Sequence, residues 1–131
     1  MRRFKMSSIK REEKQMDKVK NTVLKRNIAS NMETAVAIKI AGNVVDYDNS
    51  SCGKILLIIS NTGSAPKKAT IVKGNSLQGT EDLEVSVANG KTMALVLESG
   101  KFVNVSGENK GNLVIKAEDD TSLKIQVIEL P

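Results

Sequence analysis

The chain has 131 residues, which is enough for one domain with an appended segment. Cys52 is the only cysteine, so an intrachain disulfide is excluded, and the absence of histidine removes the commonest general base and metal ligand. The longest apolar run is too short to span a bilayer, and no apolar segment follows the basic first residues. We therefore expect no membrane span and no secretory signal peptide.

The net charge of +5 is unevenly distributed. Residues 1–30 contain ten basic and three acidic side chains, which gives +7, and residues 31–131 contain ten basic and twelve acidic side chains, which gives −2. This change in composition predicts two parts, a basic arm over residues 1–30 and a second domain over residues 31–131.

The arm is predicted to be helical from Ser8 to Ile28, because this segment lacks proline and glycine and is rich in helix-forming residues. Ile9, Met16 and Val23 recur every seven residues, and Val19 lies near the same side, so they would form a narrow apolar stripe on a charged helix. Such a helix is marginal alone and gains from a partner that covers the stripe.

Three roles for this arm stay open: a solvated helix or one packed on its own domain, an anchor on an acidic protein surface, and a nucleic-acid contact. Phe4 is its only aromatic residue, which disfavours base stacking. The candidate contact residues are basic or lie on the stripe: Arg2, Arg3, Ile9, Lys10, Arg11, Lys14, Met16, Lys18, Val19, Val23, Lys25 and Arg26.

From Thr34 onward the apolar pattern has a period of two, which is typical of strands. Eight short strands are predicted, over residues 36–40, 54–60, 68–73, 83–87, 92–98, 102–105, 113–116 and 123–130. The continuous apolar run from Ile55 to Ile59 predicts a central strand, and Asn89-Gly90 predicts a hairpin turn. The spacing of the strands favours a mainly β fold, an immunoglobulin-like antiparallel β-sandwich preceded by the basic helix.

The sequence contains only weak matches to catalytic and ligand-binding motifs. The loop Gly74–Thr80 lacks the lysine of a phosphate-binding loop, and Asp46–Ser50 lacks the glycine and the terminal glutamate of a calcium loop. Two acidic clusters occur where turns or strand edges are expected, at Glu81, Asp82 and Glu84 and at Glu118, Asp119 and Asp120. We expect no enzymatic activity, no metal site and no cofactor.

Three stretches of the second half carry a resemblance: residues 73–87, Asn89-Gly-Lys-Thr92, and residues 97–111. They are similar to small structural proteins encoded among the head genes of tailed bacteriophages and of prophages of Gram-positive bacteria. The resemblance covers about residues 60–131 and rests on turn and strand residues.

The resemblance implies a capsid decoration protein, made in the host cytoplasm and bound to the exterior of the capsid. Its partner would be the acidic outer surface of the major capsid protein, reached by the N-terminal arm, and a homo-oligomer on the lattice stays open. Two further roles also stay open, a tail or baseplate protein and a cytoplasmic nucleic-acid-associated adaptor. Nucleic acid is the less favoured partner.

Overall fold

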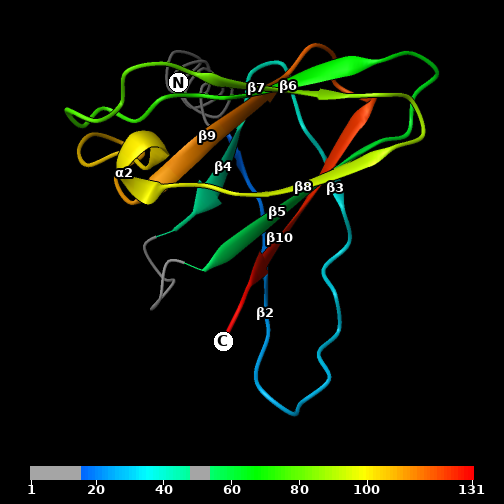
Figure 1. The fold of residues 1–131 in the computed structure, drawn as a ribbon, viewed down its shortest axis with the longest axis horizontal. Helices are drawn as coiled ribbons and strands as arrows, with labels where there is room; N and C mark the ends of the chain where they lie inside the picture. The colour runs from blue at the N-terminus through cyan, green and yellow to red at the C-terminus, as the bar shows by residue number, and fades with distance from the viewer. Residues whose placement is uncertain (1–15, 48–53) are drawn as a thin grey trace, which may run out of the picture.

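The computed structural model describes residues 16–47 and 54–131, and in these the protein is mainly β. The strands form two mixed sheets (Figure 1). The first sheet has the order β1 (Asp17–Lys18), β4 (Asn43–Asp46), β9 (Asn112–Ala117), β6 (Lys67–Ile71) and β7 (Leu83–Val87). The second has the order β2 (Asn21–Val23), β10 (Leu123–Glu129), β5 (Ile55–Asn61) and β8 (Thr92–Val96), and β3 (Val36–Ala37) also pairs with β10.

The two sheets share one hydrophobic core. Alternate residues of each strand point inward, as the period of two predicts, and the core includes fully buried side chains from both sheets. These include Ile55, Leu57, Ile59, Ile71, Leu113, Ile115, Leu123 and Ile125. Each such side chain contributes about 1.5–3 kcal/mol by leaving water, so aliphatic residues supply the stability that a nearly aromatic-free chain requires.

Strand β5 is central in its sheet, as its apolar run predicts. It pairs antiparallel with β10 over seven residue pairs, from Leu123↔Asn61 to Glu129↔Ile55, and with β8 on its other side. At its end the buried Asn61 donates from Nδ2 to the carbonyls of Ala65 and Val87, both at 2.9 Å, and its Oδ1 accepts from the Gly63 N–H. Because Val87 ends β7, this amide connects the two sheets.

The predicted helix over residues 8–28 is wrong for its described part. Residues 17–18 form β1, which runs parallel to β4, and residues 21–23 form β2, which runs parallel to β10. Val19, between them, is only 4% exposed and packs in the core. The β-branched Val19, Thr22 and Val23 favour extended backbone, and the edges of β4 and β10 supply hydrogen-bond partners that a marginal helix cannot match. The antiparallel prediction is corrected too, since these two pairings are parallel.

The Asn89-Gly90 turn does not close a hairpin. Gly90 has the positive φ that the turn signal requires, at 75°, but β7 belongs to the first sheet and β8 to the second. The turn therefore carries the chain across the core from one sheet to the other. Among the described strands only β6 and β7 are neighbours both in sequence and in a sheet.

Two further local predictions differ from the structure. The strand expected at residues 102–105 is absent, and a short helix, α2 (Ser99–Phe102), buries Phe102 in the core instead. The sequence pattern also fails to predict β4, whose Asn-Val-Val-Asp sequence is too short to show a period. Both cases arise because a stretch of about four residues carries little pattern, and tertiary contacts decide its conformation.

The placement of Val19 yields a test. We expect Val19→Ala to lower the free energy of unfolding by about 2 kcal/mol, because it removes buried methyl groups and leaves a cavity. Val23→Ala is the matched control: Val23 is 52% exposed, so its cost should be below about 0.5 kcal/mol. Urea denaturation measures both, and equal small effects would contradict the placement of Val19 in the core.

The hydrogen bonds of the Asn61 side-chain amide yield a second test of stability. Asn61→Ala should cost about 3 kcal/mol, because it removes three hydrogen bonds and leaves the buried Val87 carbonyl without the amide donor. Ser64→Ala, at an exposed position of the same turn, should change stability by less than about 0.5 kcal/mol. An Asn61→Ala protein that unfolds at the wild-type urea concentration would show that this amide does not hold the sheets together.

Candidate functional site

The described part of the basic segment ends in a projecting loop, residues 24–32, which we call the basic loop. It connects β2 to β3 and extends away from both sheets at the bottom of Figure 1. Its neck is closed by hydrogen bonds. The Glu33 N–H donates to Thr22 Oγ1 at 2.9 Å, Gln126 Nε2 donates to the Glu33 carbonyl at 3.2 Å, and the Leu24 N–H donates to the Glu129 carbonyl at 2.9 Å.

The tip of this loop presents both charge and apolar surface. Lys25 and Arg26 are exposed, Asn27 has a φ of 61°, and Ile28 follows at 61% exposed. The Lys25–Ile28 bridge, with Ile28 N–H donating to the Lys25 carbonyl at 3.4 Å, makes the turn tight. Two cations and an exposed aliphatic side chain therefore stand together on four consecutive residues.

Half of the twelve predicted contact residues lie within the described part of the chain. Six lie outside the described residues: Arg2, Arg3, Ile9, Lys10, Arg11 and Lys14. Lys25 and Arg26 are on the basic loop, and Lys18 is an exposed residue whose ammonium lies 3.7 Å from an Asp46 carboxylate oxygen.

The three described residues of the apolar stripe do not share one surface. Met16 is half-buried next to Gly42, Val19 is in the core, and Val23 is exposed on β2. A stripe at helical spacing separates in this way because the backbone is extended here and passes from one sheet to the other. Val19 is therefore corrected from a contact residue to a core residue.

Sequence reasoning missed the apolar members of the basic loop, Ile28 and Met32, both of which are exposed. The signal was present in the cluster Asn27, Ser30 and Asn31, since such polar residues mark turns and Asn tolerates a positive φ. This cluster could have ended the predicted helix before Asn27 and placed Ile28 on a loop.

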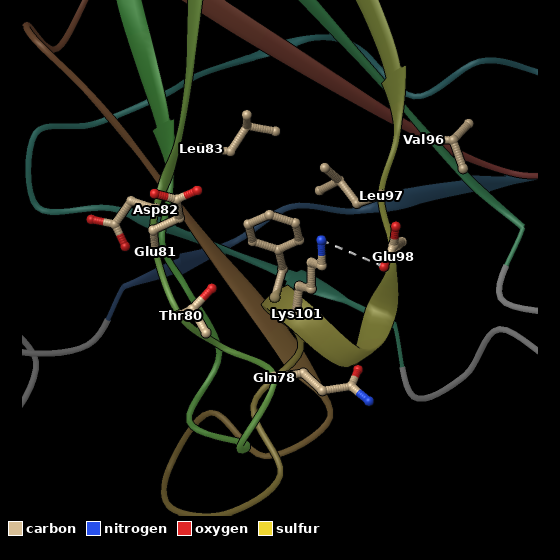
Figure 2. A pocket seen from close by; sticks show the side chains of 10 residues that line it. Gln78, Thr80, Glu81, Asp82, Leu83, Val96, Leu97, Glu98 and Lys101 are labelled. Atoms are coloured by element: carbon tan, nitrogen blue, oxygen red, sulfur yellow. Dashed lines mark ion pairs between the residues drawn. The ribbon is translucent and has the colours of Figure 1, made fainter.

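A second candidate feature is a groove of about 280 Å³ at one end of the two sheets (Figure 2). It lies between the beginning of β7, the end of β8 and α2. Leu83 and Leu97 line opposite walls, the buried Phe102 is a further lining residue, and Glu98 pairs with Lys101 at 3.9 Å on the rim.

The polar rim of this groove is mostly committed to local contacts. Asp82 accepts from the Lys73 N–H at 2.8 Å, and the Glu98–Lys101 pair is exposed, so it contributes little to stability. Glu81 is an exposed carboxylate. With three carboxylates and one ammonium, the groove carries a small negative charge next to its apolar lining residues.

The acidic clusters are turn and strand contacts in the structure. Glu84 pairs across β6 and β7 with Lys68 at 3.8 Å, and Glu118 accepts from the Lys68 N–H. Asp120 Oδ1 accepts from the Ile40 N–H at 2.8 Å. Glu118 and Asp120 therefore hold backbone in place and Glu84 pairs with a side chain on the neighbouring strand. Within residues 16–47 and 54–131 no group of three or more acidic or cysteine side chains could hold a metal ion.

The Gly74–Thr80 loop is held in shape by hydrogen bonds to α2. The Gly74 N–H donates to the Lys101 carbonyl at 2.9 Å, and Ser76 Oγ donates to the Gly100 carbonyl at 2.7 Å. A Cβ on Gly79 would lie 2.0 Å from the Gly74 carbonyl oxygen, so glycine is required by close approach within the loop. Close packing within the loop therefore explains Gly79, and no bound phosphate is needed to explain it.

Comparison with family models, with curated proteins and with solved structures finds no match for this chain. The described part of the chain also contains no helix of the length and apolarity needed to cross a membrane.

Asp119 gives a prediction of pH dependence. Donation from Ser122 Oγ at 2.6 Å is the main cause, with donation from the Ser122 N–H at 2.8 Å next, of a pKa for Asp119 of about 2 instead of 3.8. A lowered pKa in the folded state means that this stabilisation is present above pH 3.8 and is lost as the pH falls towards 2.

We therefore expect Asp119→Asn to melt below wild type at neutral pH, with a gap that closes as the pH approaches about 2. Glu108→Gln, at an exposed loop position, should show no such closing gap. Thermal melts between pH 7 and about pH 2 measure the difference in melting temperature between wild type and variant. A difference that stays constant with pH would rule out the ionised Asp119 as its source.

Proposed function

We propose that this protein is a non-enzymatic structural protein that attaches to an acidic macromolecular surface through its basic N-terminal segment. In its specific form, it is a capsid decoration protein on the outer surface of the major capsid lattice of a tailed bacteriophage. The observation that carries the proposal is the separation of charge, with +7 over residues 1–30 and −2 over the remainder.

The basic loop supports this proposal from the described residues. Lys25 and Arg26 stand at the tip of a projection whose neck is fixed by hydrogen bonds, so they can reach a partner without unfolding the sheets. Arg in particular pairs with carboxylates in a two-pronged geometry. An acidic protein surface provides many such carboxylates.

Charge and apolar contact would have separate effects. Exposed ion pairs mainly steer and orient a complex, and salt screens them. Burying an exposed aliphatic side chain contributes about 1.5–3 kcal/mol, so Ile28 and Met32 would supply affinity that persists at high salt. The loop combines the two kinds of contact on one short segment.

We infer that the two sheets form an immunoglobulin-like sandwich. Support comes from the single core that both sheets share and from the crossing connections that place sequence-distant strands side by side. The basic segment, residues 1–30, is then partly built into the sandwich, since residues 17–23 contribute strands to both sheets. A helical arm would have stood apart from the domain.

The test uses charge reversal in the basic loop of the full-length chain. We expect Lys25→Glu/Arg26→Glu to weaken binding at least about tenfold to capsids assembled from the cognate major capsid protein, measured by co-sedimentation. Lys110→Glu, at an exposed position on the loop between α2 and β9, is the control for charge reversal elsewhere and should bind normally. Unchanged binding by the double variant would remove the basic loop from the interface.

Deletion of residues 1–15 tests whether the part of the basic segment that precedes β1 contributes to binding. It must stop before β1, because a deletion to residue 30 would remove two strands and the core residue Val19. We expect a folded protein with reduced capsid binding. Nucleic-acid binding is the contrary outcome: retention on DNA, falling steeply with salt by roughly one phosphate per contacting cation, would favour the adaptor role.

A further inference from the structure

Strand β8 is an edge strand that leaves one side open. It is the last strand of the second sheet, and no other strand of residues 16–47 and 54–131 pairs with its outer edge. Such an edge presents a row of backbone N–H and C=O groups to any chain that can pair with it.

The register shows which groups point outward. The Asn61 N–H donates to the Lys91 carbonyl at 2.9 Å, which makes Asn61 and Lys91 a hydrogen-bonded pair, and these pairs alternate along an antiparallel ladder. Met93 and Leu95, opposite Ile59 and Leu57, therefore bond to β5. The backbone groups of Thr92, Ala94 and Val96 point to the open edge.

This edge lacks the usual protection against pairing. The sequence Thr92-Met-Ala-Leu-Val96 contains no charge and no proline. The edge strand of the first sheet, β7, differs, because its Glu84 pairs with Lys68 on its outer face. At the other boundary, β1 consists of Asp17 and Lys18. Among these edges, β8 is the apolar one.

Its side chains are also incompletely covered. Val96 is 63% exposed, Met93 is 44% exposed although it faces the core side, and Ala94 is exposed. A neighbouring strand would cover the open side of Met93 and Leu95 and would satisfy the outward backbone groups in one step. Surface and backbone therefore both indicate an added strand.

We propose that the added strand is β8 of a second copy of this chain, paired antiparallel about a twofold axis at Ala94. In this register Thr92 lies opposite Val96 of the second copy and Met93 opposite Leu95, so no like charges face each other. The proposal does not depend on capsid binding.

Charge favours this orientation over a parallel one. Lys91 precedes β8 and Glu98 follows it, so antiparallel pairing places each lysine opposite Leu97 of the other copy, one residue from its Glu98. Parallel pairing would bring lysine to lysine and glutamate to glutamate. The symmetric antiparallel pair is therefore the self-complementary one.

Sedimentation of the full chain tests the proposal. The wild type should show a concentration-dependent dimer, and Ala94→Lys should weaken it at least about tenfold by placing two ammonium groups at the axis. Ser86→Lys, at an exposed position on the edge strand β7, is the matched control and should dimerise normally. A wild type that stays monomeric to millimolar concentration would overturn the proposal.

Cysteine cross-linking tests the register, in a Cys52→Ser background that removes the only native thiol. Ala94→Cys should form a disulfide dimer, because residues at the axis have Cα atoms about 5.5 Å apart, within the range of a disulfide. Thr92→Cys alone should not form a disulfide, because position 92 of the second copy is offset by four residues along the paired strand, roughly 14 Å away. Mixing it with Val96→Cys should restore the cross-link.

Equal cross-linking of Ala94→Cys and Thr92→Cys would mean random collision and would overturn the register. Ala94 and Thr92 are both exposed, so the variants should keep the wild-type circular dichroism and melting temperature. This keeps loss of dimerisation distinct from loss of fold.

Discussion

The buried amide of Asn61 determines how the two sheets are connected. Its Nδ2 reaches the carbonyl of Val87 at the end of β7, and its backbone bonds to Gly90 and Lys91 in the turn that follows. These contacts direct the chain across the core after β7, so that β8 joins the second sheet instead of pairing with β7. The open edge of β8 is a consequence of this crossing.

Sequence periodicity predicted the long strands well and their partners poorly. β10 alternates over seven residues, so its inward face could be assigned from the sequence, whereas the continuous apolar run of β5 predicted a central strand without indicating which face lies inward. The Asn89-Gly90 signal, in contrast, specifies only a positive φ at Gly90, which serves a crossing as well as a hairpin. Pairing depends on contacts such as those of Asn61, which lie far away in sequence.

The basic segment shows the same limit at the candidate site. Counting charge located the segment and included Lys25 and Arg26, which project on the basic loop. A period of seven over Met16 and Val23 predicted a helix, but a few apolar residues fit that spacing by chance, and strand edges at β4 and β10 offered better hydrogen bonding. Ile28 was missed because a helical interpretation gave it no distinct surface.

The two proposed contacts occupy opposite edges of the second sheet. The basic loop emerges beside β10, and β8 lies beyond β5 on the other side. A dimer formed through β8 would continue the sheet through both copies and place the two β2 strands roughly 34 Å apart, seven strand spacings. Because the twofold axis is perpendicular to the sheet, the two basic loops would project from opposite edges of one rigid body and in opposite directions along the strands. An acidic surface that runs along the face of the continuous sheet could contact both loops, and two weak contacts held at fixed separation bind far more tightly than one. On such a surface, self-pairing would strengthen attachment without any new contact to the partner.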